Sequence, residues 1–103
     1  MKLSEERKSE LREVKECCKV SLPEFKTRYN NLDKIGKITV YQSIIDEDLE
    51  FEGDKLNESS EKVLEFLRSD KSIAKILLRA NRSNEPIKDE DGNEYDVYGL
   101  TLY

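Results

Sequence analysis

The chain has 103 residues, enough for one modest hydrophobic core, and we expect residues 1–103 to form a single domain. Hydrophobic residues make up 36% of the chain and charged residues 40%, and the formal net charge is −5. There is no histidine, which removes the commonest general base near neutral pH and the commonest metal ligand, so we expect no enzyme activity, no metal and no cofactor.

The sequence also carries no signal for export or for membrane insertion. Its longest apolar run, Ile76-Leu77-Leu78, is far too short to cross a bilayer, and the first residues lack the apolar stretch of a signal peptide. Cys17 and Cys18 are adjacent, a spacing that seldom forms a disulfide and that matches no metal or redox motif. We therefore expect reduced cysteines, a cytoplasmic protein and no membrane partner.

The first two elements read as helices. Residues 4–19 have strong helix formers throughout and apolar residues at 3–4 spacing. Their first turns are almost entirely polar, which is consistent with residues 1–20 forming a partly independent arm, and the oligomeric state stays open. A second helix is predicted to begin at Ser21, with Pro23 in its first turn. We expect one apolar face on it and an end at Gly36; that face holds Leu22, Phe25, Tyr29 and Leu32.

The middle of the chain reads differently. Residues 37–45 are rich in β-branched side chains and are predicted to form a strand, followed by a turn at 46–48 and a partner strand at 49–52. Two helices are then predicted, from about Asn57 to Arg68 and over 71–82. The inward-facing residues expected on these two helices are Val63, Phe66, Leu67, Ile73, Ile76, Leu77 and Ala80.

The end of the chain is predicted to be a hairpin. Its turn is marked by the Asp-Gly step within residues 89–93, and residues 94–103 form the longest strand-like run. The predicted order is α-α-β-β-α-α-β-β, which gives an α+β fold with a small antiparallel sheet covered by helices on one face. The alternative is a winged-helix-like fold, with the 71–82 helix as recognition helix and the 86–103 hairpin as wing.

An acidic run is the first candidate for function. Six carboxylates fall within nine residues that contain no positive charge, a pattern that repels nucleic acid and attracts a basic protein. Such a surface is also able to imitate a phosphate backbone. The competing interpretation is a solvated turn and edge strand kept soluble by charge. With two tyrosines of the final strand, the predicted partner-binding residues are Asp46, Glu47, Asp48, Glu50, Glu52, Asp54, Tyr95 and Tyr98.

A basic stripe is the second candidate. Its cations recur at spacings of 3 or 4 and would lie on one face of the 71–82 helix and its N-terminal edge: Arg68, Lys71, Lys75, Arg79 and Arg82. This pattern suits a helix that enters a nucleic-acid groove. Against it stand the acidic hairpin tip, Asp89-Glu90-Asp91, and the net negative charge. The plain alternative is a solvated helix face with weak ion pairs.

Two metal-dependent readings are weaker. Residues 89–94 begin like a calcium loop, but Glu94 stands where the loop needs glycine and Leu100 where it needs a bidentate glutamate, so a hairpin turn explains them. A divalent-metal enzyme built on Asp46, Asp48 and Glu50 has no supporting lysine or histidine at a recognisable spacing.

Together these patterns favour a small acidic protein-binding module. We expect an inhibitor or adaptor that acts on a protein partner with a basic surface, for instance a nucleic-acid-mimicking inhibitor of phage or mobile-element type. The alternative is a helix-turn-helix or winged-helix regulator that binds nucleic acid through the basic stripe, which the acidity of the chain makes the less favoured reading.

Overall fold

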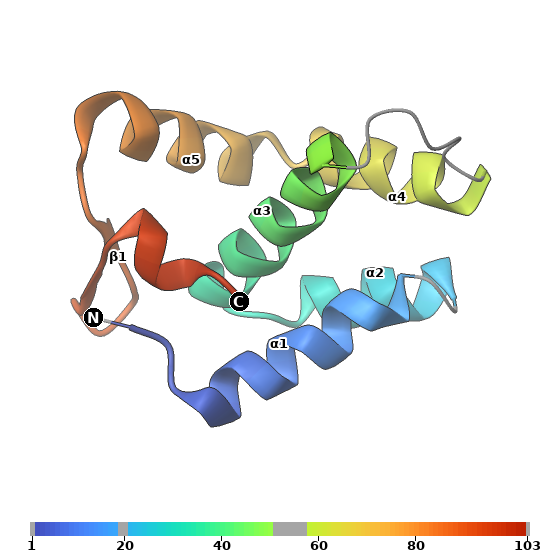
Figure 1. Ribbon diagram of the computed structural model, residues 1–103, viewed down its shortest axis with the longest axis horizontal. Coiled ribbons are helices and arrows are strands. Elements are labelled where there is room, and N and C mark those ends of the chain that lie inside the picture. Colours follow the sequence, from blue (N-terminus) through green and yellow to red (C-terminus); the bar gives the residue numbers. More distant parts are fainter. Residues whose placement is uncertain (1, 19–20, 51–57, 103) are drawn as a thin grey trace.

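The computed structural model describes residues 2–18, 21–50 and 58–102, and this part of the chain is mostly helical. Its helices lie in two layers joined by α3, with a small hairpin and a short 3₁₀ turn at one end (Figure 1). The elements are α1 Glu5–Cys17, α2 Leu22–Asn30, α3 Lys34–Glu50, α4 Glu58–Ser69, α5 Lys71–Ser83, β1 Ile87–Lys88, β2 Glu94–Tyr95 and the 3₁₀ helix η1 Val97–Leu100.

The first two helices confirm the sequence prediction at their starts. The Ser4 hydroxyl caps α1 by accepting from the Arg7 N–H at 3.1 Å, and the Ser21 hydroxyl accepts from the Glu24 N–H at 3.5 Å at the start of α2. Leu11 of α1 is fully buried, and α1 packs against both α2 and α3. Phe25 and Tyr29 of α2 are buried as expected.

The predicted hairpin over 37–52 is wrong, because Lys34–Glu50 is one continuous helix. The β-branched residues that suggested a strand are buried on several sides of α3, which contacts α1, α2, α4, α5 and η1. A helix that contacts neighbours on several sides has buried residues on more than one face, so its sequence shows no single amphipathic stripe. Burial of Ile38 and Val40, both 0% exposed, outweighs their weak intrinsic preference for strands.

Two buried hydroxyls on α3 fit the same packing. Thr39 and Ser43 are at most 1% exposed, and each donates its hydroxyl proton to the carbonyl four residues earlier, Ile35 at 2.9 Å and Thr39 at 2.8 Å. These polar side chains therefore enter the core without an unpaired donor.

The start of α3 also corrects the expected role of Gly36. The sequence placed this glycine at the end of the second helix, whereas α2 ends at Asn30 and Gly36 lies in the first turn of α3. The Asp33 carboxylate accepts from the Gly36 N–H at 2.9 Å and caps α3. A β-carbon at Gly36 would lie 2.9 Å from an Arg7 nitrogen and 3.2 Å from a Leu11 methyl, so α1 approaches α3 closely here.

The other layer consists of α4 and α5, whose positions confirm the two helices predicted there. The expected core residues Val63, Leu67 and Ile73 are buried. Phe66 of α4 meets α2 edge-on, with ring centroids 6.1 Å from Phe25 and 5.6 Å from Tyr29. The Tyr29 hydroxyl also donates to Asp70, the residue before α5, at 3.2 Å.

The chain ends in a shorter hairpin than the sequence predicted. Strands β1 and β2 have two residues each, with Ile87 opposite Tyr95, and the predicted strand over 94–103 gives way to η1 after Tyr95. The chain after η1 is tied down: Arg12 donates twice to the Leu102 carbonyl, at 2.8 and 3.1 Å, and Gln42 donates to the Leu100 carbonyl.

The fold class is therefore not the expected α+β arrangement. The described residues contain one two-stranded sheet, and the helices enclose one another rather than covering a sheet. The winged-helix-like alternative is wrong as well. It needs a sheet with a long hairpin as its wing, whereas the hairpin of this chain has strands of two residues each.

Candidate functional site

The predicted acidic surface is only partly within the described residues. Asp46, Glu47, Asp48 and Glu50 lie toward the C-terminal end of α3 instead of on a turn and strand, and the Asp46 side chain is exposed. Glu52 and Asp54 lie outside the described residues. The last turn of α3 contains no basic residue. Carboxylates near a helix C-terminus interact unfavourably with the helix dipole, so the dipole does not account for the acidic run at this position.

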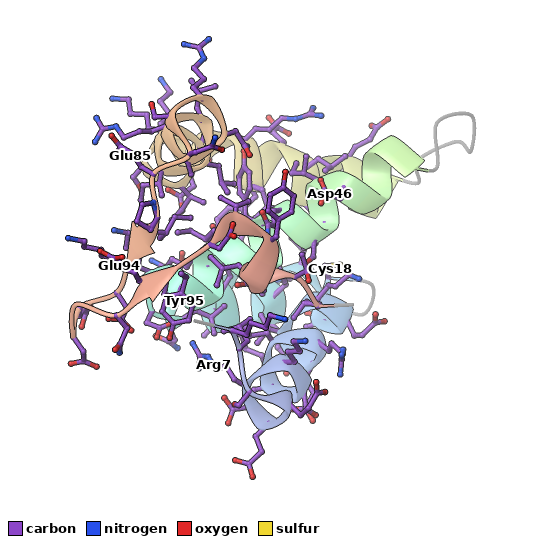
Figure 2. All side chains as sticks on the ribbon, turned by 60° about the vertical axis from the view of Figure 1, so that its left-hand side comes forward. Arg7, Cys18, Asp46, Glu85, Glu94 and Tyr95 are labelled. Atoms are coloured by element: carbon purple, nitrogen blue, oxygen red, sulfur yellow. The ribbon has the colours of Figure 1, made fainter. Side chains whose placement is uncertain are left out.

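The two tyrosines expected in the same site lie apart from this end of α3. Tyr95 is half-buried in β2 and faces the hairpin turn, where desolvation and the nearby Asp89 carboxylate raise its pKa. Tyr98 lies in η1 and is 84% exposed. Figure 2 shows Asp46 on a different side of the molecule from Glu85 and Glu94, which border the Tyr98 hollow described next.

Tyr98 borders a hollow of about 400 Å³ between the end of α5, the segment after it and η1. Three carboxylates and two amides share the lining with this ring: Glu85, Glu94, Asp96, Asn81 and Asn84. Asp96 caps η1 by accepting from the Tyr98 N–H at 3.1 Å, which fixes the carboxylate next to the ring. An exposed aromatic ring beside several carboxylates is suited to a positively charged side chain.

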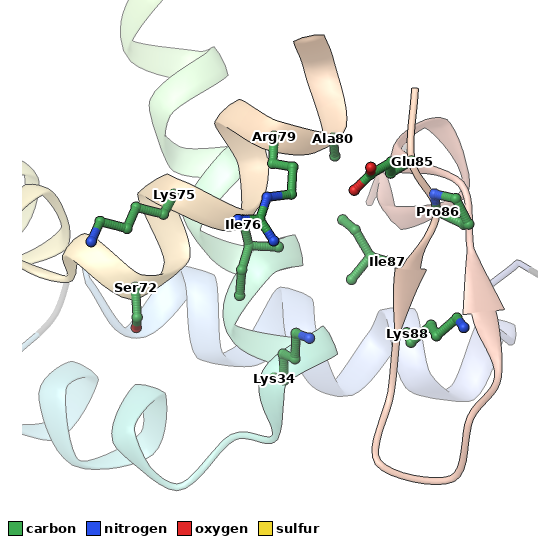
Figure 3. A pocket seen from close by; sticks show the side chains of 10 residues that line it. All are labelled: Lys34, Ser72, Lys75, Ile76, Arg79, Ala80, Glu85, Pro86, Ile87 and Lys88. Atoms are coloured by element: carbon green, nitrogen blue, oxygen red, sulfur yellow. The ribbon is translucent and has the colours of Figure 1, made fainter. Parts of the chain in front are cut away.

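The basic stripe is placed largely as the sequence predicted. Arg68 is exposed on α4, and the other four cations, Lys71, Lys75, Arg79 and Arg82, are exposed along α5. Two cations of the stripe border a hollow. Lys75 and Arg79 line a groove of about 560 Å³ between α5 and β1, together with Lys34 and Lys88 (Figure 3).

The hairpin turn is held by hydrogen bonds to the Asp89 carboxylate. The Asp89 carboxylate accepts from the Asp91 and Asn93 N–H groups and from the Asn93 side-chain amide. Desolvation alone would raise the pKa of Asp89, but these hydrogen bonds outweigh it and leave the pKa below its ordinary value. Within residues 2–18, 21–50 and 58–102, no three Cys, Asp or Glu side chains gather in a way that could hold a metal ion.

Comparison with known proteins adds no assignment. No known protein family, curated protein or solved structure is significantly similar to this chain. In the described part of the chain, no helix is both long enough and apolar enough to span a membrane. The assignment of function therefore depends on the two hollows beside α5.

Sequence reasoning missed several residues of these hollows. Lys34 precedes Lys75 by 41 positions in the sequence. It was not predicted to be near Lys75, because the sequence placed it at the end of the second helix and not at the start of α3. Asn81, Asn84 and Glu85 carried one usable signal, since an asparagine just before Glu85-Pro86 is typical of a left-handed helix end, and Asn84 has φ of 52°.

Proposed function

We propose that this protein is a small binding module, without catalytic activity, that recognises a protein partner through a basic side chain of that partner. The single observation that carries the proposal is the hollow bordered by Tyr98, in which an 84% exposed ring stands beside Glu85, Glu94 and Asp96. A guanidinium or ammonium group in this hollow would gain both a π face and carboxylate partners.

Energetic considerations support this site over a generic charged surface. Large exposed aromatic residues are enriched among the side chains that dominate interface energies. Among the described residues, Tyr98 and Leu78 are the exposed large hydrophobic side chains, and Tyr98 is the one that borders the acidic hollow. The hollow is bordered on one side by the end of α5 and on another by η1, so a bound side chain would contact both elements.

The acidic end of α3 supports the same kind of partner. Asp46, Glu47, Asp48 and Glu50 give this end of the helix a run of negative charge with no basic residue in its last turn. A basic partner surface would meet these carboxylates in addition to the Tyr98 hollow, and their field would speed its association at low salt.

The test is a binding titration with a short arginine-rich peptide, followed by NMR shifts of the backbone amides. We expect the shifts to centre on residues 94–98, and Tyr98→Ala to weaken binding about five- to thirty-fold, the equivalent of about 1–2 kcal/mol for an interface anchor. Asp96→Asn retains an acceptor for the Tyr98 N–H and removes only charge, so it should weaken binding while η1 stays folded.

Leu78→Ala is the matched control, because it removes the other exposed large side chain, which lines neither hollow. Equal weakening by Tyr98→Ala and Leu78→Ala, or no weakening by either, would contradict the proposal. The alternative function, nucleic-acid binding by the basic stripe, predicts instead that a DNA duplex binds and that Arg82→Glu abolishes binding.

A further inference from the structure

A second hollow lies along α5 next to the Tyr98 hollow, shares Ala80, Glu85 and Pro86 with it and is lined mainly by cations. It is a groove between α5 and β1, with Lys34 of α3 at one end (Figure 3). Its volume is about 560 Å³. Ligand pockets in proteins span roughly 300–1,000 Å³, so the groove has room for a few side chains of a bound peptide.

The groove is lined by four cations and one carboxylate: Lys34, Lys75, Arg79, Lys88 and Glu85. Lys88 has a partner, since its ammonium lies 3.7 Å from a Glu94 carboxylate oxygen across the hairpin. Within the described part of the chain, Lys34, Lys75 and Arg79 are exposed and make no ion pair. The Arg79 and Lys34 side chains reach toward the same part of the groove (Figure 3).

The positions of these cations are electrostatically unfavourable in the free protein. Lys34 is the first residue of α3, where the helix dipole disfavours positive charge. Lys75 and Arg79 are four residues apart on α5, a spacing at which like charges repel. An anion bound in the groove would relieve both repulsions, so the arrangement favours a negatively charged ligand.

The apolar floor of the groove favours an acidic peptide over a nucleic acid as the bound anion. It is made of Ile76, Ala80 and Ile87, of which Ala80 and Ile87 are each 4% exposed. Among the described residues that line the groove none is aromatic, so it offers no stacking platform for bases. An apolar floor under unpaired cations is complementary to a peptide that carries acidic side chains around an aliphatic one.

The neighbouring hairpin turn disfavours a long polyanion. Lys34 also borders a small hollow whose other lining residues include Asp89, Glu90 and Asp91. A nucleic-acid backbone that continued past Lys34 would meet these carboxylates, whereas a short peptide segment would end before them.

We propose that the groove between α5 and β1 is a docking site for an acidic peptide segment of a partner protein. An aliphatic side chain of that segment seats on Ile76 and Ile87, and carboxylates on either side of it pair with Arg79 and Lys34. The site is distinct from the Tyr98 hollow and takes ligands of the opposite charge.

The experiment uses a fluorescent peptide in which glutamates flank one leucine, measured by anisotropy at low and at physiological salt. A second peptide has serine in place of the leucine, and an unlabelled DNA duplex and single strand serve as competitors. The variants are Arg79→Glu and Lys34→Glu. Arg82→Glu is the matched control, because Arg82 lies one turn away on the same helix, carries the same charge and does not line the groove. Circular dichroism confirms that each variant is folded.

We expect Arg79→Glu and Lys34→Glu each to weaken binding of the leucine peptide at least tenfold, Arg82→Glu to weaken it less than threefold, and the serine peptide to bind several-fold more weakly. Tyr98→Ala should leave the affinity unchanged, which separates this proposal from the proposed function. Equal loss in Arg79→Glu and Arg82→Glu with efficient competition by DNA would overturn the proposal in favour of a nucleic-acid surface. Absence of peptide binding at low salt would overturn it outright.

Discussion

The close approach of α1 to α3 gives a sharp test of the fold through Gly36→Ala. The new methyl carbon would lie 2.9 Å from an Arg7 side-chain nitrogen, 2.9 Å from the Asp33 carboxylate and 3.2 Å from a Leu11 methyl. Arg7 and Asp33 are partly exposed and able to move, but moving them breaks their ion pair and the cap on α3. Leu11 is 0% exposed and has no space to yield.

The expected magnitude follows from these contacts. Loss of the Asp33 cap costs about 1 kcal/mol, the exposed Arg7–Asp33 pair contributes at most about 1 kcal/mol, and crowding of Leu11 costs about 1–2 kcal/mol. Alanine returns about 1 kcal/mol because it favours a helix more than glycine does. We therefore expect Gly36→Ala to lower the free energy of unfolding by about 1–3 kcal/mol, and the melting temperature by about 4–8 °C for each kcal/mol lost.

The assay is urea unfolding followed by circular dichroism at 222 nm, with Asp33→Ala measured beside it. Asp33→Ala removes the cap without crowding Leu11, so it should cost about 1 kcal/mol and be milder than Gly36→Ala. A Gly36→Ala protein as stable as the wild type would show that α1 does not pack on the first turn of α3.

Two further predictions concern ties between distant parts of the chain. Tyr29→Phe removes the hydrogen bond to Asp70 and should cost about 0.5–1.5 kcal/mol at neutral pH. Burial, reinforced by Asp70, raises the pKa of Tyr29 above its ordinary value of 10.0. The contribution of the protonated Tyr29 to the free energy of unfolding is therefore complete below pH 10 and is lost as the pH rises further. The free energy of unfolding should decline less steeply above pH 10 in Tyr29→Phe than in the wild type, and equal slopes of stability against pH would contradict this. Arg12→Ala removes both hydrogen bonds to the Leu102 carbonyl, so amide exchange in residues 100–102 should accelerate while exchange in α4 stays unchanged.

Four helices were readable from the sequence because each has a local signature. Ser4, Ser21 and Pro23 mark two starts, and the apolar residues of α4 and α5 recur every three or four positions over a polar opposite face. The surface side of α5 was correct for the same reason, since its four cations share the face that is left exposed. Amphipathic helices at the surface can therefore be predicted from the spacing of their apolar residues.

Helix α3 was wrongly predicted as a hairpin because it lies at the centre of the fold. It contacts α1, α2, α4, α5 and η1, and its residues Ile35, Ile38, Val40 and Ile44 are all buried. Their pattern lacks the one-sided period of a surface helix, and their β-branched character favours a strand prediction. One local signal was present and was not used: Asp33 stands three residues before Gly36, the spacing of a helix cap. Recognition of that cap would have split the predicted second helix and placed a helix start at Lys34.

Two misassigned segments, α3 and η1, explain why both hollows beside α5 escaped prediction. Each hollow joins α5 to residues that are distant in sequence: Lys34 comes from the start of α3, and Tyr98 from a turn that read as a strand. The two hollows share Ala80, Glu85 and Pro86, because the chain leaves α5 through the left-handed Asn84 and passes between them. A sequence shows that charge is segregated along the chain, but only the packing of α3 and η1 against α5 brings Lys34 to one hollow and Tyr98 to the other. The two binding experiments therefore test that packing as well as the proposed partners.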